Sequence, residues 1–203
     1  DRCCYPWSVM STAATPRPAT FDDLRAIPEA ERFHEVIHGE VVRKAAPSGP
    51  HGRAQRKTGA CLDPYDRPAG SGGGPGGWWL ASEVEVELAP HEVYRPDVVG
   101  WRRERLPDLP RASPVRSRPD WVCEVVSPSH PGRDRVVKLR AYREYGVPHY
   151  WLLDPDSGTL LVHRLVADGC LVALAAERGE RVRAEPFDAI EIAIDALLGD
   201  APA

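Results

Sequence analysis

The apolar run WVCEVV, residues 121–126, restricts the folds open to this chain more than any other stretch. Read as a strand, it places Val122, Glu124 and Val126 on one face of a sheet, because side chains alternate between the two faces. The run predicts a central strand that is buried on both faces. An unpaired charge is costly to bury, so Glu124 needs a cation, a metal ion or a proton as its partner.

The segment after this run predicts a helix over residues 132–146, because Gly146 and the following Pro148 are stop signals. At helical spacing one side of it is an apolar arc made of Val137, Ala141, Tyr142 and Tyr145. Lys138 projects from the middle of this arc, so a lysine faces inward beside the inward glutamate. The alternative is a surface pair of Asp134 and Lys138 at i, i+4, which contributes about a few tenths of a kcal/mol.

The rest of the chain reads as short strands with few helices. We expect a helix capped by Thr20, a hairpin around His38 and Gly39, and a helix over residues 51–62. The further expected elements are a glycine-rich loop at 67–77, a half-exposed strand at 79–90, a strand at 94–101, two strands within 149–165, and short strands at 170–176 and 190–194. This order predicts an α/β or α+β fold with a mixed sheet.

Asp97 is a second candidate for chemistry. As part of a strand it shares a face with Val99 and Trp101, so it too lies on a partly apolar side. The alternative is a turn aspartate after Pro96. Two inward carboxylates suit a hard cation such as Mg²⁺, which takes oxygen ligands in octahedral geometry. A nearby lysine can orient or deprotonate the attacking water and stabilise charge on a phosphate.

Several blocks of the sequence together resemble a known family. They are FDDLRAIPEAERFHEVIHGEVV, YRPDVVGW, PDWVCEVVSPS and RDRVVKLRAYREYGVPHYWLLDP. In this order they are similar to the Uma-two family of restriction-endonuclease-like proteins, over about residues 20–198. The resemblance implies a PD-(D/E)xK nuclease fold, in which a central mixed β-sheet is flanked by helices and carries a divalent-metal site at its strand ends.

The resemblance also assigns roles to the two carboxylates and the lysine. Asp97 matches the aspartate of the PD motif, and Glu124 matches the second acidic metal ligand. Val126 stands where the plain motif has its lysine. The family shows the same displacement, with the lysine on the following helix, which is Lys138 here. The implied metal is Mg²⁺ or Mn²⁺, held by Asp97 and Glu124.

Two further residues enter through the resemblance. Glu35 would be an additional acidic residue of the catalytic set, and its alternative is a solvated glutamate at a strand end. His51 matches a family histidine near the site, although a lone histidine is more often structural.

DNA contacts are expected from local positive charge. The net charge of −4 excludes a generally basic surface. Arg133, Arg135 and Arg140 crowd the helix after Glu124, and are candidates for contacts to phosphates. The alternative is a solvated charged face.

Length and composition fit one domain. The chain has 203 residues, of which 42% are hydrophobic, and we expect a poorly ordered tail over residues 1–19 and a single domain over residues 20–200. Its five cysteines are odd in number and lack metal spacing, which favours reduced thiols. No apolar run has membrane-spanning length, and the first residues lack the order of a secretory signal, so a cytoplasmic protein is expected.

The sequence thus predicts a Mg²⁺-dependent endonuclease that hydrolyses DNA phosphodiester bonds with a metal-activated water. RNA or another phosphodiester is not separated from DNA at this stage. The second hypothesis is a catalytically inactive DNA-binding or dimerisation module of the same fold. A homodimer is expected only by analogy with the fold class.

Overall fold

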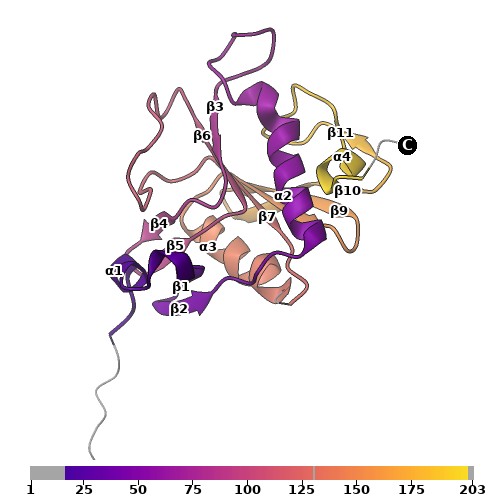
Figure 1. The fold of residues 1–203 in the computed structure, drawn as a ribbon. Coiled ribbons are helices and arrows are strands. Elements are labelled where there is room, and N and C mark those ends of the chain that lie inside the picture. Colours follow the sequence, from indigo (N-terminus) through magenta and orange to yellow (C-terminus); the bar gives the residue numbers. More distant parts are fainter. Residues whose placement is uncertain (1–16, 130, 201–203) are drawn as a thin grey trace, which may run out of the picture.

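The computed structural model describes residues 17–129 and 131–200. The tail predicted over residues 1–19 therefore lies almost entirely outside the described residues. At the centre is a large mixed sheet (Figure 1). Its strand order is β10 (Gly169–Glu177), β9 (Thr159–Val166), β8 (His149–Asp154), β7 (Trp121–Val125), β6 (Val98–Arg102) and β3 (Trp78–Ala81). β7 is parallel to β8 and antiparallel to β6, which confirms the predicted mixed sheet.

A second, smaller sheet carries the first part of the chain. Its order is β2 (Glu40–Arg43), β1 (His34–Ile37), β5 (Glu92–Tyr94) and β4 (Val86–Ala89). β1 and β2 form the predicted hairpin. Its two turn residues have positive φ angles, 51° at His38 and 76° at Gly39, as the tight two-residue hairpin turn requires.

The helices cover both faces of the large sheet. They are α1 (Phe21–Arg25), η1 (Glu29–Glu31), α2 (Gly49–Leu62), η2 (Asp63–Tyr65), η3 (Arg133–Lys138), α3 (Leu139–Glu144) and α4 (Ile194–Leu198). α2 and α4 contact each other on one face, and α3 lies on the other (Figure 1). The ribbon pair β11 (Arg181–Val182) and β12 (Ile192–Ala193) precedes α4.

β7 is buried on both faces, as its sequence predicts. Trp121, Cys123 and Val125 belong to an apolar cluster shared with α2 and α4. Val122 belongs to a second cluster, which also contains residues of α3 and of the small sheet. Glu124 shares the second face and is 1% exposed, so a charged group does sit in an apolar layer.

The prediction of one half-exposed strand over residues 79–90 is wrong. The chain forms β3 and β4 instead, and these belong to different sheets. Glu83 lies between them with a φ of 58°, a left-handed conformation that is uncommon for a residue with a side chain. Its amide donates to the carbonyl of Pro96 at 3.1 Å. The alternation of apolar and polar residues continues across this turn, so the sequence does not indicate that the chain passes from one sheet to the other.

The strand predicted over residues 94–101 is also divided. Tyr94 ends β5 in the small sheet, and β6 begins at Val98 in the large one. Asp97 therefore lies directly before its strand, not within it. Val99 and Trp101 still pack in the second apolar cluster.

The helix predicted over residues 132–146 forms in two parts. Its first part, η3, is π-helical, and α3 continues it. The chain then leaves at Gly146 with a φ of 73°. Asp134 and Lys138 are the buried residues of η3. π-Helical turns are rare and often occur at functional sites.

Candidate active site

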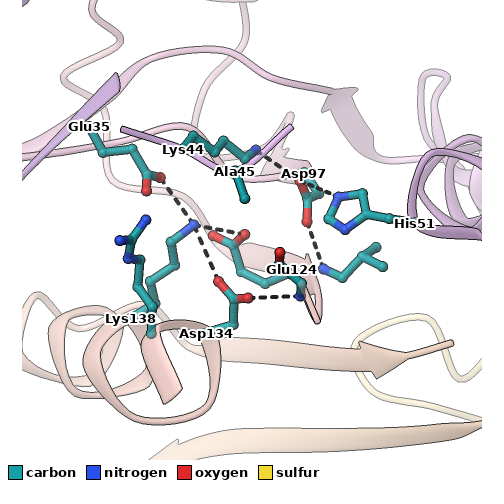
Figure 2. Close-up of a pocket in the computed structure, with 11 residues that line it drawn as sticks. Glu35, Lys44, Ala45, His51, Asp97, Glu124, Asp134 and Lys138 are labelled. Atoms are coloured by element: carbon teal, nitrogen blue, oxygen red, sulfur yellow. Dashed lines mark hydrogen bonds and ion pairs between the residues drawn. The ribbon is translucent and has the colours of Figure 1, made fainter. Parts of the chain in front are cut away.

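Asp97 and Glu124 meet because of the strand register. β6 and β7 are antiparallel, with Val98 opposite Cys123. Asp97 directly precedes Val98 and Glu124 directly follows Cys123, so both carboxylates lie at the same end of the two strands. Asp97 is 0% exposed and Glu124 is 1% exposed. Figure 2 shows them side by side above η3.

Asp97 is held by one lysine, one histidine and the backbone. Lys44 Nζ lies 2.8 Å from Asp97 Oδ1, and His51 Nε2 lies 3.2 Å from the same oxygen. The amide of Val125 donates to Asp97 Oδ2 at 2.7 Å. The carboxylate of Asp97 thus has partners from the segment after β2, from α2 and from β7.

Glu124 finds its partners on the helix that follows its strand. Lys138 Nζ lies 3.0 Å from Glu124 Oε2, and the hydroxyl of Tyr142 donates to Oε1 at 2.7 Å. Lys138 is itself 1% exposed. The inward lysine predicted from the helical pattern is confirmed by this geometry.

Two more carboxylates surround Lys138. Glu35 Oε1 lies 3.0 Å from Lys138 Nζ and accepts from the amide of Arg95 at 2.9 Å. Asp134 Oδ1 lies 3.8 Å from Lys138 Nζ, and its other oxygen accepts from the amide of Ser127 at 3.1 Å. The Asp134–Lys138 pair therefore exists, but both residues are buried and it is not a surface pair.

These side chains enclose a small cavity of about 20 Å³, room for one water-sized occupant. Glu35, Asp97, Glu124 and Lys138 line it together with Lys44 and His51. Glu35 Oε2 and His51 Nδ1 are buried and have no hydrogen-bond partner among the residues that the structure describes. A buried polar atom without a partner in a native fold calls for an unseen water, ion or ligand.

Both lysines of the site are held as ammonium ions. Burial would lower the pKa of Lys138, but Glu124 and Glu35 outweigh it and hold the pKa well above that of an ordinary lysine. Burial opposes the charge of Lys44 in the same way, and Asp97 again reverses the effect and raises its pKa. Lys138 is therefore suited to donate to a negative charge and not to remove a proton from water.

The two carboxylates at the strand ends have opposite pKa shifts. Burial would raise the pKa of Asp97, but Lys44 and His51 lower it below the usual aspartate range. Burial raises the pKa of Glu124, and Lys138 opposes this only in part because the charge of Asp97 is close. Burial also raises the pKa of Asp134. Burial is therefore the main reason why Glu124 and Asp134 hold their protons more readily than exposed carboxyl groups do.

The donor atoms of the cavity fit a divalent cation, and the charge balance of the cavity is negative. Four buried carboxylates, those of Asp97, Glu124, Glu35 and Asp134, face two lysine ammonium groups. When all six groups are ionised, two negative charges remain among them, and the guanidinium of Arg133, which also lines the cavity, offsets one of these. Carboxylate oxygens are the ligands that such hard cations prefer.

The same donors do not form a preorganised metal site. Across the described part of the chain, no group of three or more His, Cys, Asp or Glu side chains is arranged to hold a metal ion. Both oxygens of Asp97 and both oxygens of Glu124 already have partners. A cation that takes these oxygens must therefore compete with Lys44 and Lys138.

The structure brings only one of the three candidate DNA-binding arginines to the cavity. Arg133 lines it, and donates to the carbonyl of Arg43 at 2.9 Å. Arg135 is paired with Asp154. Arg140 is exposed on α3. DNA contacts by Arg135 and Arg140 stay predictions.

Sequence reasoning missed Lys44 and gave Asp134 too small a role. Lys44 also contacts Glu83 Oε1 and the carbonyl of Arg95, at 2.8 and 2.7 Å. A signal existed, since alternation from β2 puts Lys44 on the same face as Val42, which packs on the second apolar cluster.

A mixed sheet with an aspartate before one strand, a glutamate inside the next and a lysine on the following helix defines a restriction-endonuclease-like domain. The sequence model of the Uma2 family, described as "Putative restriction endonuclease", matches residues 19–195. The chain belongs to this family, as the sequence resemblance predicted. A comparison with curated proteins finds no match.

The fold is similar to that of a solved structure from Anabaena variabilis ATCC 29413, described as a "putative nuclease belonging to DUF820". The TM-score is 0.68 at 22% sequence identity, and the likeness covers 89% of this chain and 98% of that one. At this identity the likeness establishes the fold. Within the described residues, no helix is both long and apolar enough to cross a membrane.

Proposed function

We propose that this chain is a divalent-metal-dependent endonuclease that hydrolyses phosphodiester bonds in DNA. Asp97 and Glu124 would hold Mg²⁺ or Mn²⁺, with Glu35 as a further acidic group beside them. When bound, the metal would lower the pKa of a water ligand and polarise the phosphate. Membership of a family described as restriction endonucleases supports DNA as the substrate.

The chain's own residues would bind and orient the reacting groups. Lys138, held as an ammonium ion by Glu124 and Glu35, can donate hydrogen bonds to the phosphate or to the attacking water. Lys44 can do the same from the other side of the cavity. Within the described part of the chain His51 Nδ1 has no hydrogen-bond partner, so it is available to a substrate or water atom.

One observation carries this proposal. Four buried carboxylates from three separate parts of the chain converge on one cavity with the buried Lys138 and the half-buried Lys44. Buried ionic groups add little to stability when compared with apolar residues of the same size, and clusters with shifted pKa values concentrate at functional sites. A function explains this arrangement better than structural support does.

The test is cleavage of plasmid DNA and of single-stranded DNA with Mg²⁺ or Mn²⁺ by wild type, Asp97→Asn and Lys138→Met. We expect each variant to lose at least about 100-fold in rate, as for removal of a group that stabilises the transition state. Asp108→Asn, a change of an exposed aspartate, is the matched control and should cleave as wild type does. An Asp97→Asn variant that cleaves at the wild-type rate would contradict the proposal.

The second candidate is a catalytically inactive DNA-binding or dimerisation module. This candidate is favoured because the carboxylates of Asp97 and Glu124 already form ion pairs with the two lysines. This candidate predicts DNA binding without cleavage at any concentration of Mg²⁺ or Mn²⁺. The same cleavage experiment on both kinds of DNA separates the two.

A further inference from the structure

A groove of about 750 Å³ lies next to the cavity of the candidate active site. Lys44, Ala45, His51 and Arg133 line both spaces. Whatever occupies the groove therefore reaches the residues that contact Asp97. The volume is in the range of sites that enclose a ligand of small-molecule size, about 300–1,000 Å³, so the groove has room for part of one nucleic-acid strand.

One wall of the groove is apolar and carries an exposed aromatic ring. Phe33 is 55% exposed, and it is joined along the groove by Ala45, Ala46 and Pro47. The guanidinium of Arg95 lies 5.7 Å from the centre of the Phe33 ring. Arg95 is held in place by the carbonyls of Arg32 and Glu83, at 2.6 and 3.2 Å. Phe33 and Arg95 thus form a flat surface, and these hydrogen bonds fix the position of Arg95 in it.

The charge of the groove is positive although the chain is acidic. Its charged residues are the cations Arg43, Lys44, Arg95 and Arg133 and the single anion Glu83, on a chain with a net charge of −4. Arg133 donates to the carbonyl of Arg43, so the guanidinium group of Arg133 lies beside the backbone of Arg43. A basic groove with an exposed aromatic ring is the combination that binds unpaired nucleotides.

We propose that this groove binds a single-stranded segment of nucleic acid, with one base stacked on Phe33 and neighbouring phosphates at Arg43 and Arg133. This deepens the proposed nuclease function and rests on it for the reaction. A base offers its flat face to an aromatic side chain only when it is not stacked inside a duplex. The nuclease would therefore act on single strands, frayed ends or flipped nucleotides.

The groove also leads a bound nucleic-acid strand toward the residues of the candidate active site. Lys44 faces the groove and contacts Asp97 Oδ1 at 2.8 Å. A phosphate one step along the strand from the stacked base would lie near Lys44 and His51. Phe33 is a substrate-binding residue in this account and takes no part in the chemistry.

The test is fluorescence anisotropy of a labelled oligothymidylate and of a labelled duplex, both in EDTA so that no cleavage occurs. We expect wild type to prefer the single strand. Phe33→Ala should weaken its binding by about 5- to 150-fold, the loss expected for one base–aromatic stack. Phe33→Trp should keep the affinity. Leu171→Ala, at a residue 47% exposed on β10, is the matched control and should bind as wild type does.

Three results would overturn the groove proposal: equal affinity for Phe33→Ala and wild type, no preference for the single strand, or no binding of it. Failure of the proposed nuclease function would give a different result. A wild type that binds the single strand through Phe33 but cleaves no nucleic acid with Mg²⁺ or Mn²⁺ would overturn the reaction and leave the groove standing.

Discussion

Lys138 is the residue that allows carboxylates to lie in the apolar layer of this fold. Its ammonium group contacts Glu124 and Glu35, each at 3.0 Å. The sequence alone predicted both the inward glutamate and the inward lysine, because strand and helix periodicity are local properties. It did not predict Lys44, whose role depends on how the hairpin end meets Asp97 from a distant part of the chain.

Removal of Lys138 should therefore destabilise the fold. In Lys138→Met the buried carboxylates lose their cation, and we expect the free energy of unfolding to fall by about 3–5 kcal/mol, as for other broken buried ion pairs. Urea denaturation in EDTA measures this. Arg140→Met, a change two residues along at an exposed position, should have little effect. Equal stabilities for the two variants would contradict the role given to Lys138.

Glu124 should give the fold a characteristic pH dependence. Burial raises the pKa of Glu124 above its ordinary value of 4.5, so the folded state binds more protons than the unfolded state above this pH. The free energy of unfolding then falls as pH rises from about 4.5 through the raised pKa.

The variant Glu124→Gln removes this titration, so its stability should fall less steeply with pH over the same window. Urea denaturation at a series of pH values in EDTA would show it. Parallel pH profiles for wild type and variant would contradict the raised pKa.

Among the helices and strands, α2 was predicted from the sequence, but the position of its first residue was not. A helix was predicted over residues 51–62, and α2 spans Gly49–Leu62. It begins earlier because Ser48 caps it, accepting from the amide of His51 at 3.3 Å, and because Pro50 fits the first turn. The single strand predicted over residues 79–90 does not form. The left-handed backbone of Glu83 interrupts it, although the sequence alternates regularly there.

The cap of α2 positions two residues of the site. His51 contacts Asp97, and Gln55 Nε2 donates to the carbonyl of Asp97 at 3.0 Å. Ser48→Ala should lower the free energy of unfolding by about 1 kcal/mol, which chemical denaturation can measure. Ser82→Ala changes an exposed serine outside any helix and should leave stability almost unchanged. A Ser48→Ala variant as stable as Ser82→Ala would show that the cap contributes little.

The whole molecule is built around one site shared by two sheets. Ile37 and Tyr94 of the small sheet pack in the same apolar cluster as Val99 and Val122 of the large sheet. The sequence predicted the mixed sheet and its central strand. It did not predict that the first strands form a second sheet, because pairing between distant segments leaves no local signal.

Because the two sheets share a core, the chain should unfold as one unit, as the predicted single domain over residues 20–200 requires. Scanning calorimetry of the full chain should give one transition, with a calorimetric enthalpy equal to the van't Hoff enthalpy. Two separate transitions would show that the sheets form independent domains. The expected homodimer stays a prediction, which sedimentation at several concentrations can check.

The central claim is that Asp97 and Glu124 hold a divalent cation in competition with the lysines. Calorimetric titration of Mn²⁺ and Mg²⁺ into wild type, Asp97→Asn and Glu124→Gln tests it most directly, with Asp108→Asn as the control. We predict binding to wild type and the control, and a loss of binding in both site variants. Equal binding by all four proteins, or none by wild type even with uncleavable DNA present, would contradict the claim.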